Sequence, residues 1–435
     1  MGRHAVFTIV HLPSHTILFA RAFRGCFFCN TDSMSATAPN YNHTVTACFV
    51  GYITQAVINN FMPLLFVTFA ATLGIDMARL SALITVNFVT QLVVDVLAGK
   101  FVDRIGYKPC IIAAHLAALA GLLALGLLPT RVPDPYLAIL AAIFLYALGG
   151  GLIEVMVSPH RRGLPERTQG QGDEPAALLL LLGQLGTVAI STLFLFAFGT
   201  GSWPVLACLW AIVPAIGIAM FAGAPMPRIV PEGTATMRFA DLSKKPVFYL
   251  MFLMMLCAGA AEQGMSQWAS AFAESGLGVT KVIGDLAGPA AFALMMGLSR
   301  TIYGVLGHRL DLTAFIASSS VLCVAMYLTA ALTTAPVLGL LACALTGFSV
   351  GIMWPGTFSM AADAMPGGGT LMFALLAVAG DLGCAGGPAV VGLVASANGD
   401  SLKTGLLFGS MFALVLLACV VAARKTVVGE REPLH

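Results

Sequence analysis

The sequence predicts an all-α membrane protein with twelve transmembrane helices arranged as two six-helix halves. Hydrophobic residues make up 58% of the 435 residues and charged residues only 10%, and the mean hydropathy is +0.91. A soluble protein carries about 25% charged residues, so this composition is typical of a chain dissolved in lipid. The apolar residues also gather in runs of about 20, which is the length that an α-helix needs to cross a bilayer.

Twelve such runs follow one another along the chain, as spans 1 to 12. The first six cover residues 45–71, 79–99, 109–129, 136–158, 176–199 and 203–224. The last six cover residues 247–272, 284–306, 312–333, 336–360, 368–396 and 402–423. Residues 225–246, between spans 6 and 7, are rich in proline and basic residues, which predicts a cytoplasmic linker. We therefore expect an N-terminal six-helix half at 43–224, a C-terminal half at 247–424 and a cytoplasmic tail at 425–435.

Residues 1–42 differ in character from the spans and are expected to form an N-terminal extension. Histidines, a proline and arginines interrupt the apolar residues of 1–33, so that no 20-residue span forms there. No small-residue cleavage site follows a clean apolar core, as it would in a secretory signal. Met34 begins a more ordinary start, and we expect the native protein to begin there.

Lysines and arginines are distributed unevenly between the two sides of the membrane. With both termini cytoplasmic, fifteen of them lie in or beside cytoplasmic loops and the tail. The other side has four, which are Arg79, Arg131, Lys281 and Lys403. Because cytoplasmic loops carry the excess of basic residues, we expect this orientation, in a plasma membrane of the bacterial inner-membrane type.

The composition and motifs disfavour several kinds of function. A formal net charge of +2 is too small to indicate nucleic-acid binding. The ten cysteines show no disulfide spacing, and the pair Cys26 and Cys29 has no second pair or histidine beside it. Neither a disulfide framework nor a metal site is therefore expected. The sequence contains no nucleotide-binding motif, so ATP is not expected to be a direct energy source.

The loop between spans 2 and 3 reads GKFVDRIGYKP and fits the pattern G-x-x-x-D-R-x-G-x-[RK]. The matching residues are Gly99, Asp103, Arg104, Gly106 and Lys108. A glycine such as Gly99 lets helices approach closely, and one such as Gly106 permits a tight turn. In its sequence and its place after the second span, this loop resembles the signature loop of the major facilitator superfamily. Asp95, four residues before the motif, is expected to belong to the same cytoplasmic gate.

The resemblance to this superfamily covers roughly residues 43–424. It implies two helical halves related by an axis along the membrane normal, with a solute site near the midplane between them. It also implies transport by alternating access, in which the two halves rock about the bound solute.

Parts of three spans resemble the fucose-permease-like sugar:proton symporters of this superfamily. In span 4, the stretch LIEVMVSP places Glu154 five residues before Pro159, as in the fourth span of those proteins. Asn59 and Asn60 resemble their paired asparagines in span 1, and GIMWPGTFSMA, with Trp354, resembles their tenth span. The acidic residue that follows the asparagines in those proteins is absent, and FMPL stands in its place. The resemblance implies a sugar-like solute carried with protons, with one acidic residue of the pattern missing.

Carboxylates interrupt the apolar spans at Glu154 in span 4, Glu262 in span 7 and Asp381 in span 11. A charged side chain at the bilayer centre costs about 2.5–3.5 kcal/mol on insertion scales, so such residues usually face the interior of the bundle. We expect these three residues to bind and release the coupling proton. The structural alternative is a permanently protonated acid that pairs helices by hydrogen bonding.

Side-chain amides and indoles within the spans are the candidate solute ligands. Gln263 and Gln267 are four residues apart and share one face of span 7, next to Trp268, and Asn87 and Gln91 have the same spacing in span 2. Amides bond to hydroxyl groups and an indole stacks on an apolar ring face, so this set suits a small polar solute. The alternative is hydrogen bonding and packing between helices. The proposed ligands are Asn59, Asn60, Gln91, Gln263, Gln267, Trp268 and Trp354.

Residues 160–183 depart from the pattern of the proteins that the chain resembles. Those proteins continue after Ser-Pro with a stretch similar to IVEA and open span 5 with one similar to SLLHSFYCWG. Possible codons for HRRGL and EPAALLLLLG, read one base later, give both stretches. We therefore hypothesise a compensated frameshift or a sequencing error across 160–183. The alternative is a genuine leucine-rich span 5.

These observations together predict a secondary active transporter that moves a small polar solute, with a sugar favoured, by alternating access and with protons. The expected partners are the solute, protons and the lipid bilayer. No nucleic acid, cofactor or enzymatic activity is expected, and the chain is expected to act as a monomer. One alternative is a drug or metabolite exporter by proton antiport, although span 5 lacks the Gly- and Pro-rich pattern of such antiporters. Another is a non-transporting membrane sensor on the same fold.

Overall fold

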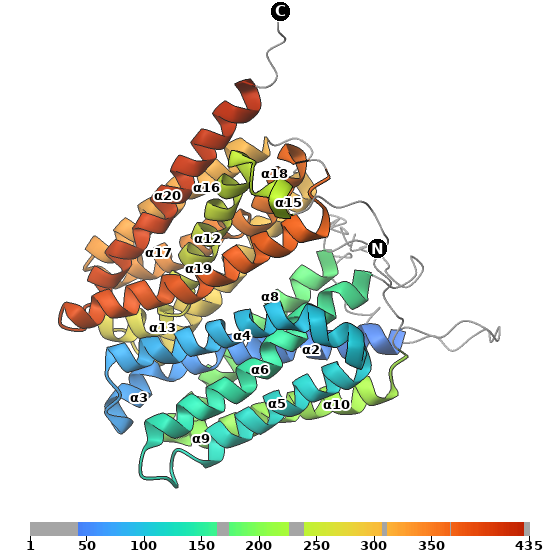
Figure 1. Ribbon diagram of the computed structural model, residues 1–435. Helices are drawn as coiled ribbons and strands as arrows, with labels where there is room; N and C mark the ends of the chain where they lie inside the picture. Colours follow the sequence, from blue (N-terminus) through green and yellow to red (C-terminus); the bar gives the residue numbers. More distant parts are fainter. Residues whose placement is uncertain (1–41, 163–173, 226–238, 307–310, 366, 430–435) are drawn as a thin grey trace, which may run out of the picture. The chain divides into compact units, whose positions relative to one another are not determined.

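The computed structural model of the chain describes residues 42–162, 174–225, 239–306, 311–365 and 367–429. These residues form helices joined by short loops, with no β-strand among them (Figure 1). Several predictions fall wholly or partly outside the described residues. They concern the N-terminal extension with its start at Met34, the segment 163–173 of the hypothesised frameshift, the segment 226–238 of the expected linker, and residues 430–435 of the expected tail.

The helices before residue 226 supply the first six spans. Span 1 comprises α2 (Asn42–Asn60), η1 (Met62–Leu65) and α3 (Phe66–Leu73). Spans 2 to 5 are α4 (Met77–Ile105), α5 (Tyr107–Leu127), α6 (Pro135–Arg162) and α8 (Glu174–Phe198). Span 6 comprises η2 (Thr200–Ser202), α9 (Trp203–Trp210) and α10 (Ile212–Gly223).

The helices after residue 238 supply the last six spans. After the short α11 (Phe239–Leu242), span 7 comprises α12 (Pro246–Ser266), α13 (Ala269–Ala271) and the π-helical η3 (Phe272–Gly276). Span 8 comprises α14 (Lys281–Asp285), the π-helical η4 (Leu286–Ala290) and α15 (Ala291–Leu306). Spans 9 to 12 are α16 (Leu312–Leu332), α17 (Pro336–Val350) with α18 (Met353–Ala364), α19 (Gly369–Ala397) and α20 (Leu402–Gly429).

Among the described residues, eleven helical units are long and apolar enough to cross a membrane, and the apolar helix Leu182–Phe198 within α8 supplies a shorter twelfth. The prediction of twelve membrane-spanning helices is therefore confirmed. Several helices run past their predicted ends, and among these extensions α4 continues to Ile105, α6 to Arg162 and α20 to Gly429. Beyond α4 the backbone of Gly106 has φ 98°, a conformation that favours glycine over any other residue.

Span 1 is broken at a proline that the sequence-based prediction placed inside a continuous helix. Pro63 has no N–H, so the carbonyl of Asn59, four residues earlier, has no helical partner. Gln267 Nε2 at the end of α12 takes this carbonyl, at 3.1 Å. A side chain from span 7 thus satisfies the backbone of span 1 at the break.

Span 10 is broken in the same way. Pro355 removes the N–H that would bond to the carbonyl of Gly351, and Arg300 Nε from α15 donates to that carbonyl at 3.0 Å. Both breaks lie beside residues that the sequence singled out, Asn59 in span 1 and Trp354 in span 10. Broken helices beside a solute site are a recurring feature of transporters.

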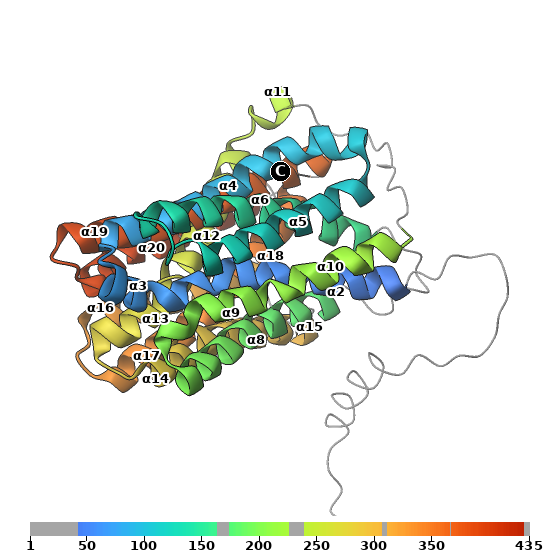
Figure 2. The same ribbon diagram turned by 90° about the horizontal axis from the view of Figure 1, so that it is seen from below.

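Small residues bring the spans into close contact. A Cβ added at Gly383 of α19 would overlap the backbone carbonyl of Leu256 on α12, and one at Gly387 would overlap that of Ala260. Because lipid tails are as apolar as the helix surfaces, the hydrophobic effect does not drive helices together in a membrane. Close packing of this kind holds them together instead. Contacts between the first and last six spans are made by α4 with α19 and by α8 with α15 (Figures 1 and 2).

Candidate functional site

A chain of hydrogen-bonded side chains begins at Glu154 and runs through the interior of the first six spans. Gln55 Nε2, on α2, donates to Glu154 Oε2 on α6 and to Gln91 Oε1 on α4, each at 2.8 Å. Gln91 Nε2 donates to Asn59 Oδ1 at 2.9 Å, and Asn87 Nδ2 donates to the same oxygen at 3.2 Å. Gln55, Asn87 and Gln91 are buried. The amides of spans 1 and 2 therefore hold one another in fixed orientations.

This series of hydrogen-bonded side chains continues into the last six spans at the break in span 1. Gln267 Nε2 donates to the freed backbone carbonyl of Asn59 and, at 3.0 Å, to Gln263 Oε1. Gln263 Nε2 then donates to Glu262 Oε1 at 3.2 Å. Through the side chain and backbone of Asn59, a continuous series of contacts links the carboxyl group of Glu154 to that of Glu262.

Several buried polar atoms on spans 1, 2, 7 and 10 have no hydrogen-bond partner among the described residues. They include Gln55 Oε1, Asn87 Oδ1, Asp95 Oδ1, Glu262 Oε2 and Trp354 Nε1. Leaving such an atom unpaired away from water costs about 1–3 kcal/mol, so native proteins keep few of them. Amide oxygens, carboxylate oxygens and an indole N–H are groups to which the hydroxyls of a hydroxyl-rich ligand bond.

Four carboxyl groups from four spans act on one another at this site. The carboxyl groups of Asp95 on α4 and Asp381 on α19 act on each other, and two such groups can form a hydrogen bond only when one of them holds a proton. Glu154 interacts electrostatically with both aspartates and with Glu262. The Glu154 side chain is exposed, and because these partners surround it, its exposed surface faces the interior of the bundle. Within the described residues no group of three or more His, Cys, Asp or Glu side chains could hold a metal ion.

The two tryptophans singled out by the sequence lie in different environments. Trp268 is fully buried, its Nε1 donates to the carbonyl of Pro388 at 3.0 Å, and its ring centroid lies 5.2 Å from that of Phe66. No part of this indole is open to a solute in this conformation. Trp354 is half-buried, its Nε1 has no partner among the described residues, and its ring lies against Gly380, where a Cβ would overlap it.

Sequence reasoning named Asn60 as a ligand and passed over Gln55. The Asn60 side chain turns back to the carbonyl of Ala56 on its own helix, at 2.9 Å, and takes no part in the chain of amides. Gln55 lies four residues before Asn59, on the same helix face. This four-residue spacing, which Asn87 and Gln91 share, is the sequence signal that predicts Gln55 to lie beside Asn59.

The predicted gate motif is described in part. Lys108 Nζ donates to the carbonyl of Ala224 beyond the end of α10, at 3.3 Å, and so joins the start of span 3 to the end of span 6. Arg104 is exposed at the end of α4. The side chain of Asp103 and the surroundings of Gly99 lie outside what the structure describes. The gate role of these residues stays a prediction.

Comparisons with solved structures agree with the twelve-helix architecture. The E. coli fucose:proton symporter shares 17% identity with the chain, over 87% of this chain and 98% of that one, with a TM-score of 0.57. The nucleoside transporter NupG shares 15% identity over 88% and 99%, with a TM-score of 0.68. A D-xylose-proton symporter shares 15% identity over 86% and 95%, with a TM-score of 0.66. At these identities the likeness establishes the fold alone.

No curated protein sequence matches the chain. The sequence model of the Major Facilitator Superfamily, however, matches residues 45–388, which is most of the chain. The matched region includes both proline breaks, the chain of amides and the loop around Gly106. The resemblance seen in that loop is therefore confirmed, and the chain belongs to the Major Facilitator Superfamily as an integral, multi-pass membrane transporter and not an enzyme.

Proposed function

We propose that this transporter carries a small, neutral, hydroxyl-rich solute, with a sugar favoured, together with protons. The observation that carries the proposal is the continuous series of contacts from Glu154 to Glu262. It places amides suited to a solute and carboxyl groups suited to a proton in one connected set. A solute that bonds to the amides therefore acts on groups that a proton can bind.

The charge of the site favours a neutral solute over an anion. Four carboxyl groups act on one another there, and Arg300, which interacts with Glu262, is a neighbouring cation. An anionic solute would meet repulsion from the carboxylates, whereas hydroxyl groups bond to the unpartnered oxygens and to Trp354 Nε1. Two of the similar structures are described as symporters of fucose and xylose and a third as a nucleoside transporter, which supports a sugar-like solute.

Proton coupling is proposed for Glu154, Glu262 and Asp381, with Asp95 as the partner of Asp381. The carboxyl groups of Asp95 on α4 and Asp381 on α19 act on each other, and a proton shared between them would hydrogen-bond the two helices together. Loss of that proton leaves two negative charges side by side in a medium of low dielectric. Their repulsion drives α4 and α19 apart, which gives protonation a direct mechanical consequence.

Alternating access is proposed as rocking of two halves, residues 43–224 against 247–424, about this site. The loop with Gly106 and Lys108 acts as the cytoplasmic gate. Both termini lie on the cytoplasmic side of a bacterial-type inner membrane, which the excess of lysines and arginines on that side supports.

Uptake by purified protein in sealed lipid vesicles tests the proposal. With fucose, D-xylose and a nucleoside offered in turn, we expect one of them to accumulate when the outside is more acidic than the inside. Abolishing the pH gradient with a protonophore should reduce uptake to equilibration. Accumulation only under the opposite gradient would instead indicate an antiporter. Binding without any flux would indicate a sensor, and indifference to all three solutes would contradict a sugar-like substrate.

A further inference from the structure

We infer that Gln55 is a positioning residue that transmits the protonation state of Glu154 to the solute-binding amides. This inference rests on the proposed proton coupling at Glu154 but on no particular solute. Gln55 lies between the two groups, since its Nε2 donates both to Glu154 Oε2 and to Gln91 Oε1. Gln91 in turn donates to Asn59, the residue at the break in span 1.

The two protonation states of Glu154 require different partners from Gln55. An ionised carboxylate only accepts hydrogen bonds, and the Gln55 amide nitrogen supplies one. A proton bound at Oε2 turns that oxygen into a donor, which needs an acceptor. Gln55 Oε1 is buried and has no partner among the described residues, so a half-turn of the amide places a ready acceptor there. No covalent bond other than the carboxyl O–H forms or breaks.

That half-turn changes what the solute meets. When Gln55 Oε1 faces Glu154, Gln55 Nε2 no longer donates to both Glu154 and Gln91. Gln91 Oε1 then needs another hydrogen-bond donor. A solute hydroxyl is such a donor. The charged groups that face Glu154 are Asp95 on α4, Glu262 on α12 and Asp381 on α19, and Arg300 on α15 acts on Glu262. These groups bias how readily the proton binds, but Gln55 makes the direct contact.

Infrared difference spectroscopy of the protein in lipid, between acidic and alkaline pH and without solute, tests this role. We expect a carboxyl band that Glu154→Gln removes, accompanied by a side-chain amide band. Gln55→Met should remove the amide band and keep the carboxyl band. Thr54→Val is the matched control, because Thr54 is the buried neighbour of Gln55 and, among the described residues, its hydroxyl bonds to the Val50 carbonyl of its own helix, at 2.9 Å. It should keep both bands.

An amide band that persists in Gln55→Met would overturn the inference, and so would a wild-type spectrum with a carboxyl band alone. A carboxyl signal untouched by Glu154→Gln would overturn it as well. Failure of every sugar to bind would leave these spectra unchanged and would count against the proposed solute only.

A separate cluster, centred on Lys281, carries a second inference. Lys281 Nζ lies 3.0 Å from Asp285 Oδ2 and 3.1 Å from Glu274 Oε1, and it donates to the backbone carbonyl of Leu64. The three N–H groups of the ammonium are therefore all used. Asp285 is fully buried and accepts further hydrogen bonds from Ser270 Oγ and, at 2.9 Å, from Thr192 Oγ1.

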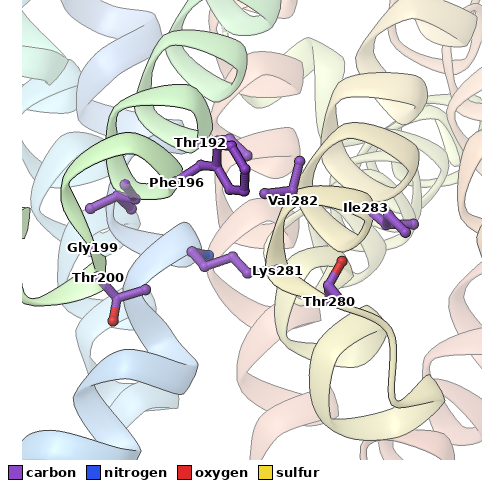
Figure 3. Close-up of a pocket in the computed structure, with 9 residues that line it drawn as sticks. Thr192, Phe196, Gly199, Thr200, Thr280, Lys281, Val282 and Ile283 are labelled. Atoms are coloured by element: carbon purple, nitrogen blue, oxygen red, sulfur yellow. The ribbon is translucent and has the colours of Figure 1, made fainter.

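Two of these bonds cross from the last six spans to the first six. One runs from Lys281 to Leu64 in η1, and the other from Thr192 in α8 to Asp285 in α14. Because successive spans run in opposite directions, the start of span 8 lies at the end of the bundle opposite to the Gly106 loop. Beside the cluster, a cavity of about 530 Å³ is lined by residues of α8 and α14 and of the loops that adjoin them (Figure 3). Beside this cavity, the Thr192–Asp285 bond joins α8 to α14.

The geometry points to a clamp, formed by Lys281, Asp285 and Thr192 with the Leu64 carbonyl, that holds this end of the bundle closed. Opening the solute site toward this end requires both crossing bonds to break. Glu274 and Asp285 belong to the same group of six spans as Lys281, so the ammonium keeps its charged partners when the crossing bonds are lost. The clamp therefore opens without leaving Lys281 unpaired.

Hydrogen–deuterium exchange of the protein in lipid nanodiscs, followed by mass spectrometry, tests the clamp. Thr192→Val removes one crossing bond with little change of shape, and Lys281→Met removes the other. We expect peptides that cover 57–76 and 277–290 to exchange roughly fivefold faster in Thr192→Val, the effect of about one hydrogen bond. Arg79→Met is the matched control, because Arg79 and Asp76 form an exposed ion pair at the same end but within one span.

Unchanged exchange in folded Thr192→Val would overturn the clamp, and this variant decides alone if Lys281→Met does not fold. Equal acceleration in Arg79→Met would also overturn it, because the effect would then not belong to the crossing bonds. Exchange reports closure of this end directly, so the result does not depend on which solute is carried.

Discussion

Gln267 Nε2 donates to the backbone carbonyl of Asn59 at 3.1 Å, and a side chain of span 7 thereby replaces the hydrogen bond that Pro63 removes from span 1. A backbone carbonyl without a hydrogen-bond partner is unfavourable in a membrane, and here a residue from the other group of six spans supplies the missing bond. Because Gln267 also holds Gln263, the same residue joins the backbone of one group to the polar side chains of the other.

A double-mutant cycle between Pro63 and Gln267 measures this relationship. Gln267→Leu should lower the free energy of unfolding by about 1–2 kcal/mol, because it leaves the Asn59 carbonyl buried and unpaired. Pro63→Ala restores an N–H four residues after Asn59, so Gln267→Leu should cost at least about 0.5 kcal/mol less in that background. Chemical unfolding of the four proteins in one detergent gives the coupling energy. Strictly additive effects would contradict the replacement.

The sequence identified the polar ends of this network but not the way in which they connect. Glu154, Glu262 and Gln267 were evident because each is costly in lipid. The break at Pro63 was not evident from the sequence, because FMPL is as apolar as its surroundings. A count of apolar residues does not detect that proline lacks a backbone N–H. Asn59 and Gln267 are 208 positions apart, and no local pattern predicts that such residues meet. Trp268 was expected to contact solute, yet its indole is fully used by Pro388 and Phe66.

Glu154→Gln tests the proton-coupling role. The substituted amide keeps the size of the side chain and bonds to Gln55 but cannot gain or lose a proton. We expect proton-driven accumulation of solute in vesicles to be abolished, while exchange of labelled for unlabelled solute across the membrane persists. The fold should be kept, as judged by an unchanged thermal midpoint within about 2 °C, because the contact to Gln55 remains. Accumulation at the wild-type level would remove Glu154 from the mechanism.

Trp354→Phe separates binding from stability. The indole N–H has no partner among the described residues, so its removal should leave the free energy of unfolding unchanged or slightly higher. If the solute is its partner, the Kd should rise roughly fivefold to tenfold, the effect of about one hydrogen bond. Calorimetric titration with the transported sugar, beside a thermal unfolding curve, gives both quantities.

Trp268→Phe is the comparison for that test. Its N–H bonds to the Pro388 carbonyl in a fully buried position, so this change should lower stability by about 1–3 kcal/mol. A loss of stability in both tryptophan variants, without a change in Kd for Trp354→Phe, would show that Trp354 is a packing residue.

Two glycines of α19, three residues apart, test whether close approach of helices holds the last six spans together. A Cβ at Gly383 would overlap the Leu256 carbonyl of α12, whereas one at Gly386 would meet nothing within 4 Å. Gly383→Ala must therefore push α12 and α19 apart, and we expect it to lower the free energy of unfolding by about 1–3 kcal/mol. Gly386→Ala should be neutral or stabilising by up to about 1 kcal/mol, since alanine is the better helix former. Thermal unfolding of both variants in the same lipid nanodiscs makes the comparison, and equal midpoints would mean that α12 yields at this contact.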